Sequence, residues 1–355
     1  MASFRAHWLT ALLIALLSTA SRLPAQSAQP WNGPGIPAAR AATAGAQAVQ
    51  MVGLTVSDMD RAIDFYTRVL DFTKISDDQV AGGEYAALEG IAGARLRVVR
   101  LRLGDELLQL TDYLTPEGRP FPARSRSNDR WFQHVAIIVS DMDRGYARLR
   151  EFKVRHASTA PQLLPKTIPN AAGIRAFYFH DPDGHFLELL QFPPDKGNPK
   201  WQRPGGRLFL GIDHTAIVVR KTRASLRFYR DALGFRMAGE SMNFGPEQEH
   251  LNNIPGARLH ITGLRAARGP GIEFLEYLRP TDGRPYPDEE RPNDLVHWET
   301  TILVPDVDSA ATLLRRDNFR LLSPRPIQLP DSTLGFKRGI LARDPDGHVV
   351  QLVEF

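Results

Sequence analysis

Apolar segments of two kinds alternate along this chain. Runs rich in β-branched residues, such as residues 51–56 and 134–139, predict strands, and segments with an apolar residue every three or four positions predict helices packed on a sheet. The first such helix follows residue 58 and places on one face Met59, Ala62, Ile63, Tyr66, Val69 and Leu70. Two or three further strands follow each helix, so the repeated order is β-α-β-β-β.

The hairpin at residues 174–192 carries the most specific local pattern. Asp181-Pro182-Asp183-Gly184 is a turn sequence, because Pro presets φ and Gly accepts a positive φ. Glu188 then breaks the apolar run of the following strand. A buried carboxyl group needs a partner, since burying it bare costs several kcal/mol. The same pattern returns at residues 344–355, where Gln351 stands in the register of Glu188.

Repetition extends over almost the whole chain. The second half repeats three motifs of the first at one offset: Phe65-Tyr66 as Phe228-Tyr229, Gly93-Ala94-Arg95-Leu96 as Gly256-Ala257-Arg258-Leu259, and the turn at Asp181 as that at Asp344. Two domains are therefore predicted, at residues 49–192 and 210–355. Each divides again into two β-α-β-β-β modules, which we number in chain order: 49–113, 132–192, 210–278 and 297–355.

The predicted fold class is α+β. A module of about 60 residues is too small to bury its own sheet face, so the modules should pair. The composition agrees with a globular protein, with 43% hydrophobic and 24% charged residues. The chain has no cysteine, which excludes disulfides, thiolate metal sites and thiol nucleophiles. Its net charge of +4 comes from scattered Lys and Arg, so nucleic acid is not an expected partner.

The N-terminal residues predict export. A basic start with Arg5 precedes an apolar run from Trp8 to Leu17 and a zone of small residues, which is the order found in secretory signal peptides. We assign residues 1–25 to a signal peptide and residues 26–48, rich in Ala, Gly, Pro and Gln, to a disordered linker. The mature protein is expected to be periplasmic or secreted, with no membrane segment left after cleavage. The apolar run is too short to span a bilayer, although an uncleaved membrane anchor remains the alternative.

Taken together, these motifs resemble the vicinal oxygen chelate superfamily, also called the glyoxalase/bleomycin-resistance/dioxygenase superfamily. The resemblance rests on the β-α-β-β-β repeat, the Phe-Tyr helix ending followed by Leu-Gly/Asp-Phe, and the Asp-Pro-Asp-Gly-His hairpin with an acid three residues later. It covers all but the first 48 or so residues, in a tandem form with four modules. It implies that two modules form an incomplete, cupped β-barrel around one site, and that the substrate is a small molecule chelated through vicinal oxygens.

The resemblance also implies two metal-ligand positions per module, one on the first strand and one on the last. Matched by register, the first-strand positions are Met51, His134, His214 and Glu299, and the last-strand positions are Gln109, Glu188, Glu273 and Gln351. The expected metal ligands are the good donors of modules 2 and 3: His134, Glu188, His214 and Glu273. Two imidazoles and two carboxylates suit a divalent ion such as Zn, Ni, Co, Mn or Fe.

The order of module pairing decides how many sites exist. If module 2 pairs with 3 and module 1 with 4, one barrel holds all four good ligands and the other is degenerate. If module 1 pairs with 2 and module 3 with 4, each barrel receives a partial set. We favour the first arrangement because it gathers the good ligands in one place.

Three functions fit these residues. A divalent ion polarises a substrate oxygen, and a neighbouring carboxylate, Glu188 or Glu273, shuttles a proton as in glyoxalase-like isomerases and lyases. The alternatives are an extradiol-type ring-cleaving dioxygenase using Fe²⁺ and a non-catalytic small-molecule-binding protein of the bleomycin-resistance kind. Export argues against a glutathione-dependent substrate, because that thiol pool is cytoplasmic.

The remaining histidines carry weaker expectations. His185 and His348 follow the two turns and are expected at the hairpin surface. His297, two residues before Glu299, is a candidate substitute ligand. The polar segment 243–253, which contains His250, is a candidate pocket rim.

Overall fold

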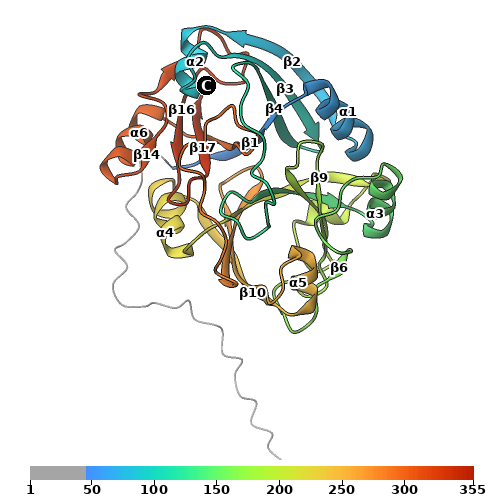
Figure 1. Cartoon of the computed structure of the whole chain (residues 1–355). Coiled ribbons are helices and arrows are strands. Elements are labelled where there is room, and N and C mark those ends of the chain that lie inside the picture. The colour runs from blue at the N-terminus through green and yellow to red at the C-terminus, as the bar shows by residue number, and fades with distance from the viewer. Residues whose placement is uncertain (1–44) are drawn as a thin grey trace, which may run out of the picture. The chain divides into compact units, whose positions relative to one another are not determined.

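The computed structural model describes residues 45–355 (Figure 1). The predicted signal peptide and the linker up to residue 44 lie outside the described residues. The backbone N–H of Ala46 donates to Leu233 O and that of Gln47 to Leu303 O, and the first strand begins at Ala48. The structure thus describes residues 45–48 of the segment assigned to the linker. Among residues 45–355, no helix is long and apolar enough to cross a bilayer.

Four successive modules with the predicted β-α-β-β-β order are present, with short helices added in modules 1 and 3 and one additional two-residue strand in module 4. Module 1 consists of β1 (Ala48–Val56), α1 (Met59–Leu70), β2 (Thr73–Ala81), α2 (Gly83–Glu89), β3 (Arg95–Leu103) and β4 (Glu106–Thr115). Module 2 consists of β5 (Gln133–Val139), α3 (Met142–Glu151), β6 (Gln162–Leu163), β7 (Arg175–His180) and β8 (Phe186–Gln191). A 3-10 helix, η1 (Pro199–Gln202), leads to the second half.

The second half repeats this order. Module 3 consists of β9 (Phe209–Val218), α4 (Thr222–Leu226), the π-helical turn η2 (Arg227–Ala232), β10 (Arg236–Phe244), α5 (Pro246–Asn252), β11 (Arg258–Arg265) and β12 (Gly271–Arg279). Module 4 consists of β13 (Trp298–Leu303), α6 (Val307–Arg316), β14 (Arg320–Leu321), β15 (Ile327–Gln328), β16 (Arg338–Arg343) and β17 (Val349–Glu354).

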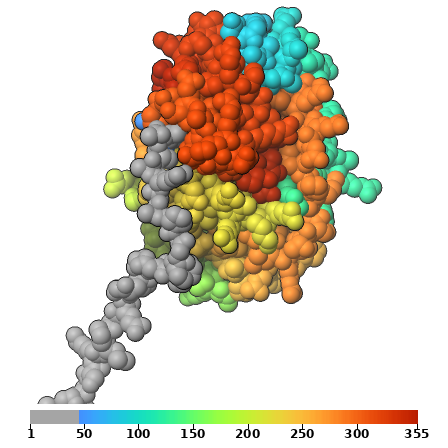
Figure 2. All heavy atoms as spheres, turned by 90° about the vertical axis from the view of Figure 1, so that its left-hand side faces the viewer, coloured from blue at the N-terminus to red at the C-terminus, as the bar shows by residue number. Residues whose placement is uncertain are grey.

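The strands form two curled sheets, and each sheet takes one module from each half. The nine-stranded sheet has the order β14-β16-β17-β13-β1-β4-β3-β2, with β15 beside β16, and the eight-stranded sheet has the order β10-β11-β12-β9-β5-β8-β7-β6. Module 1 therefore pairs with module 4 and module 2 with module 3, as we favoured. The two sequence halves do not fold as separate domains. Figure 2 shows α2, in cyan, beside module 4, in orange and red.

The same strand register recurs in all four modules. His134 pairs with Phe186, His214 with Gly271, Glu299 with Val349 and Met51 with Leu107, always two residues before the last-strand position. Strand side chains alternate between the two faces, so the first-strand and last-strand positions share a face. The register inferred from the sequence is confirmed.

Local capping and packing explain why the helices cover the sheets on their outer side (Figure 1). The side chain of Asp58 accepts a hydrogen bond from the N–H of Arg61 and begins α1, which ends where Asp71 adopts a left-handed conformation. The apolar stripe of α1 is buried with first-strand residues such as Val52 and Leu54 in one core cluster. Burial of this stripe holds the helix on its sheet.

The two histidines after the turns are buried, so their predicted surface position is wrong. His185 is fully buried: its Nδ1 lies 2.7 Å from Asp181 Oδ2 and its Nε2 lies 3.0 Å from Leu295 O. His348 makes the corresponding contact with Asp344. The turn looks exposed in sequence, but a distant segment of the chain covers it.

Candidate metal centre

Two central strands bring His134 and His214 together. β5 and β9 run antiparallel in the middle of the eight-stranded sheet, where His134 pairs with Ala216 and His214 with Ala136. Their side chains emerge on the same face, and their ring centroids are 5.7 Å apart. Glu188 reaches this face from β8, beside β5. The module pairing thus places ligands from both halves of the sequence in one barrel.

All four predicted ligands meet, with three of them closest. Glu188 Oε2 lies 3.2 Å from His134 Nε2 and 3.8 Å from His214 Nε2, and ligand atoms of these three residues all lie within 4.8 Å of one another. Glu273 is adjacent, with Oε2 at 3.6 Å from His214 Nε2.

Buried nitrogen atoms without partners test whether this group fits a metal ion. Both ring nitrogens of His134 and Nε2 of His214 make no hydrogen bond within the described part of the chain, although they are buried. Buried polar atoms are normally paired, so such atoms need an explanation. Imidazole nitrogens directed toward one carboxylate oxygen match the donor set of a divalent transition ion. The residues present therefore fit such an ion.

Asp213 orients one of the two imidazoles. Its Oδ2 lies 3.0 Å from His214 Nδ1, and the same carboxylate accepts from Trp201 Nε1 and Arg265 Nη2. A carboxylate on the second ring nitrogen fixes the tautomer that leaves Nε2 free for a ligand role. Sequence reasoning missed Asp213, although its position directly before His214 was a usable signal.

The charges of this group perturb one another. Burial alone would lower the pKa of His214, but the charges of Glu273, Asp213 and Glu188 and the hydrogen bond that His214 donates to Asp213 raise it to about 9. Burial raises the pKa of Glu273; the charge of His214 opposes this rise and that of Glu188 adds to it. The carboxylates thus favour the positively charged form of His214, and the charge of His214 favours the ionised form of Glu273, although burial disfavours both charged forms.

The corresponding positions of the other barrel are occupied differently. Gln109 Nε2 donates to Glu299 Oε1 at 3.2 Å, and Gln351 Nε2 donates to Glu299 Oε2 at 3.4 Å. Gly53, opposite Glu299, leaves room for it, since an added Cβ would lie 2.7 Å from Glu299 Cγ. Burial and the charge of Glu89 raise the pKa of Glu299 well above its usual range. The amide groups of Gln109 and Gln351 thus both donate to the buried carboxyl group of Glu299.

His297, the predicted substitute ligand, lies elsewhere. Its Nδ1 is 2.6 Å from Glu290 Oε1, and it precedes the strand of the nine-stranded sheet that carries Glu299. His250 lies on α5, and its carbonyl accepts from Thr159 N. Neither histidine belongs to the cluster around Glu188.

A cavity of about 530 Å³ opens over the candidate metal centre. Glu188, His214 and Glu273 line it, together with Asn243 and Gln248 from the segment predicted as a pocket rim. That segment contains helix α5. The metal ligands thus face a space large enough for a small molecule.

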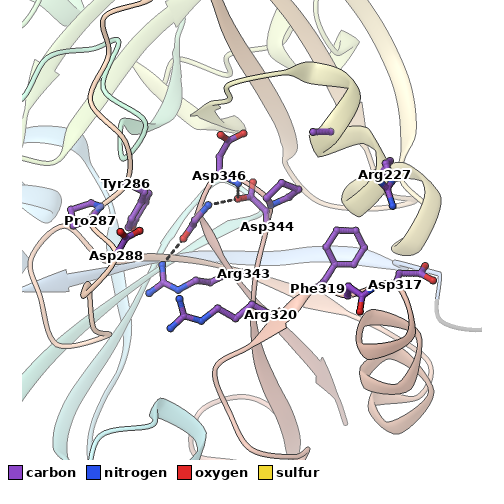
Figure 3. A pocket seen from close by; sticks show the side chains of 14 residues that line it. Arg227, Tyr286, Pro287, Asp288, Asp317, Phe319, Arg320, Arg343, Asp344 and Asp346 are labelled. Atoms are coloured by element: carbon purple, nitrogen blue, oxygen red, sulfur yellow. Dashed lines mark hydrogen bonds between the residues drawn. The ribbon is translucent and has the colours of Figure 1, made fainter.

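A larger hollow of about 660 Å³ shares no residue with this cavity. Figure 3 shows it around the module 4 turn, with Asp344 and Asp346 near Arg343 and Tyr286. The two acidic groups of the turn already have partners: Asp344 Oδ1 accepts from the N–H groups of Asp346, Gly347 and His348, and Asp346 accepts from Arg220 N. This hollow supports the turn and offers no set of ligands comparable to that around Glu188.

Comparisons with known proteins agree with this architecture. The family model described as Glyoxalase/Bleomycin resistance protein/Dioxygenase superfamily matches residues 48–189 and 211–352. A 2-epi-5-epi-valiolone epimerase from Actinomyces sp is 35% identical over 176 residues, which span 46% of this chain and 89% of that protein. Glyoxalase I of Saccharomyces cerevisiae is 23% identical over 194 residues, 52% of this chain and 56% of that protein.

Solved structures show the same fold. Glyoxalase I from Zea mays aligns with a TM-score of 0.59 and 16% identity, covering 86% of this chain and 92% of that one. A putative dioxygenase from Bacillus subtilis aligns with a TM-score of 0.52 and 11% identity, covering 87% and 86%.

Proposed function

The chain belongs to the Glyoxalase/Bleomycin resistance protein/Dioxygenase superfamily, and on that premise we propose that it is a divalent-metal-dependent isomerase-type enzyme. Its substrate is a small molecule bound through two neighbouring oxygens. The observation that carries this proposal is the meeting of His134, Glu188 and His214, with unpaired buried nitrogens, at the cavity. The relatives named as an epimerase and a glyoxalase I support a reaction of the isomerase type.

The ligand roles follow from the donor atoms. His134 and His214 would hold the ion through Nε2 and Glu188 through Oε2, with Glu273 beside them. A bound divalent ion would supply Lewis acidity toward a substrate oxygen. Asp213 keeps His214 in the tautomer that this role requires.

Glu273 is better placed than Glu188 to carry the proton. Both side chains line the cavity, but that of Glu188 is 6% exposed and lies between the two imidazoles, whereas that of Glu273 is 27% exposed. Burial raises the pKa of Glu273 above its ordinary value, so this carboxyl group holds a proton more readily than an exposed glutamate does. The positive charge of a bound ion would lower this pKa again, so the raised value describes the protein without the ion.

The proton transfer balances within the substrate. Glu273 takes a proton from a carbon beside a carbonyl group, and the electron pair of the broken C–H bond moves onto the carbonyl oxygen. The carboxylic acid of Glu273 then returns the proton. Delivery to the former carbonyl carbon, with transfer of the neighbouring hydroxyl proton to the former carbonyl oxygen, yields an isomer. Return to the opposite face of the original carbon yields an epimer and requires the deprotonated substrate to turn over in the site, because Glu273 faces one side of it. No oxidant or second substrate is needed.

A ring-cleaving dioxygenase remains the second candidate. The set of two histidines and one carboxylate at His134, His214 and Glu188 is also the set that binds Fe²⁺ in oxygenases. The two readings differ in their consumption of O₂.

Proton exchange tests the proposal directly. Metal-loaded protein is incubated in D₂O with dihydroxyacetone, and loss of its C–H signal is followed by NMR. We expect exchange that requires the ion, is lost in Glu273→Gln and is retained in Glu240→Gln, which alters another carboxylate of the same cavity.

Two other outcomes would support the dioxygenase or the small-molecule-binding protein instead. Metal binding without exchange, but with O₂ consumption on a catechol, would support the dioxygenase. Protein that binds no divalent ion after loading would leave only a small-molecule-binding role.

A further inference from the structure

We propose that the cavity over the candidate metal centre selects an uncharged, hydroxyl-rich substrate, and that the carboxamides of Asn243 and Gln248 recognise its hydroxyl groups. This inference rests on the proposed function, because it names the substrate class of the same site. It follows from the charge of the cavity, from a chain of buried amides along one wall and from the contrast with the other barrel.

Charge in the cavity disfavours anionic ligands. Its lining contains four carboxylate residues: Glu188, Asp213, Glu240 and Glu273. Among the lining residues that the structure describes, the one Lys or Arg is Arg265, whose Nη1 and Nη2 both bind Asp213 at 2.7 Å. A bound divalent ion would offset Glu188 and Glu273, so away from the ion a ligand with carboxylate or phosphate groups would meet the carboxylate of Glu240, the Asp213–Arg265 pair and no free guanidinium or ammonium group.

A directed chain of hydrogen bonds runs along one wall. Ser241 Oγ donates to Asn243 Oδ1, Asn243 Nδ2 donates to Gln248 Oε1 at 2.8 Å, and Gln248 Nε2 donates to Asn252 Oδ1. All three amide residues are buried, and Asn252 Nδ2 has no hydrogen-bond partner in the described part of the chain. This series of hydrogen bonds fixes the orientation of each carboxamide. Because every carboxamide has two N–H groups, some N–H groups remain to bind a ligand.

The equivalent wall of the other barrel has none of these amides. Helices α2 and α5 begin after Gly82 and Gly245, and this alignment places Val80 opposite Asn243 and Tyr85 opposite Gln248. Val80 and Tyr85 belong to the apolar cluster of the nine-stranded sheet. The same helix thus places Tyr85 in an apolar cluster in one barrel and Gln248 in the series of amides in the barrel with the candidate metal centre. The residue equivalent to Asn252 is Glu89, a buried carboxyl group that accepts a hydrogen bond from Tyr113 Oη.

The rest of the lining completes the match to a polyol. Tyr178 adds a hydroxyl group near the metal ligands, with its ring 4.9 Å from that of His134. Leu251 and Ile261 add apolar surface on the amide side. A carboxamide both donates and accepts, as a hydroxyl group does, and apolar side chains cover the C–H face of a ring. A cyclic polyol with a carbonyl group offers these features together.

Calorimetric titration of the metal-loaded full chain tests the inference. One probe is 2-keto-myo-inositol, which is neutral, and the other is S-lactoylglutathione, which carries carboxylates and also has two neighbouring oxygens. We expect the neutral probe to bind at least ~10-fold more tightly. This comparison uses the wild-type protein and needs no variant. Equal binding of the two probes, tighter binding of S-lactoylglutathione or no binding of the neutral probe would overturn the inference.

Variants then assign the recognition to the amides. Gln248→Met should weaken binding of 2-keto-myo-inositol by at least ~10-fold without changing metal affinity, whereas Gln79→Met, on an exposed position of β2, should change neither. Thermal melting verifies that both variants fold. Unchanged binding in Gln248→Met would refute the assignment. Failure of the wild-type protein to bind metal would instead refute the proposed function, so the two failures are distinguishable.

Discussion

Asp183 accepts hydrogen bonds from both the backbone N–H and the hydroxyl group of Ser57, 126 residues earlier in the sequence. The second half repeats this relationship, with Arg220 N donating to Asp346 across the same separation. The turns therefore connect module 1 to 2 and module 3 to 4, while the sheets connect module 1 to 4 and module 2 to 3. Together these contacts join the four modules in a closed ring.

Removal of this turn carboxylate should destabilise the fold. Asp183 is 3% exposed at its side chain and also pairs with Arg61, so Asp183→Ala leaves several donors without an acceptor. We expect the free energy of unfolding to fall by about 1–3 kcal/mol. Urea unfolding measures it, with Asp143→Ala as the control, because Asp143 also pairs with an arginine but its side chain is 77% exposed. Equal effects of the two substitutions would contradict a specific role for the turn.

The sequence was sufficient to predict the repeat and the ligand register. Strand side chains alternate with a period of two, so matching Glu188 to Gln351 and His134 to His214 placed the ligands on one face. The predicted pairing of module 2 with module 3 was also correct. It was inferred from the good donors, which are confined to those two modules. These features depend on local pattern and on chemistry that the residue types show directly.

Features set by long-range packing could not be predicted. His185 is buried because Leu295 O, 110 residues away, contacts its ring, and nothing near His185 in the sequence indicates this contact. The different roles of α2 and α5 are a second example. Tyr85 and Gln248 are both compatible with a short amphipathic helix. Tertiary packing alone determines which of them lines a cavity.

His180 should make the stability of the protein dependent on pH. Burial, with the nearby charge of Arg155, lowers the pKa of His180 from 6.5 to about 4. Between these values the unfolded chain binds more protons than the folded one, so stability rises with pH and is lost as pH falls from 6.5 to about 4. The contribution to the slope is at most about 1.4 kcal/mol per pH unit.

Comparison with His180→Asn isolates this contribution. The asparagine amide retains a donor for Gly184 O, which lies 3.0 Å from His180 Nδ1, but it does not titrate. Urea unfolding at several pH values across this window should give a flatter pH dependence in the variant. Parallel curves for the two proteins would show that His180 does not titrate as proposed.

We propose that the chain is exported, from the basic and apolar order of its first residues. N-terminal sequencing of protein produced in a Gram-negative host should give a mature chain that begins between about Gln26 and Gln29. A cytosolic chain that still begins at Met1 would refute export and would make a glutathione-linked substrate possible again.

One divalent ion per chain should depend on Glu188 and not on its counterparts in the other barrel. Glu188→Gln retains the shape of the side chain and removes its charge, so we expect metal affinity to fall by at least ~10-fold. Asp213→Asn should have an effect of similar direction, because it removes the carboxylate that orients His214. Glu299→Gln alters a buried carboxyl group of the barrel formed by modules 1 and 4 and should leave metal content unchanged.

Elemental analysis gives the stoichiometry, and thermal melting with and without the ion gives an independent measure, since an ion that binds the folded state raises the melting temperature. Two ions per chain, with one lost in Glu299→Gln, would contradict a single site, and unchanged binding in Glu188→Gln would make Glu188 a structural residue only.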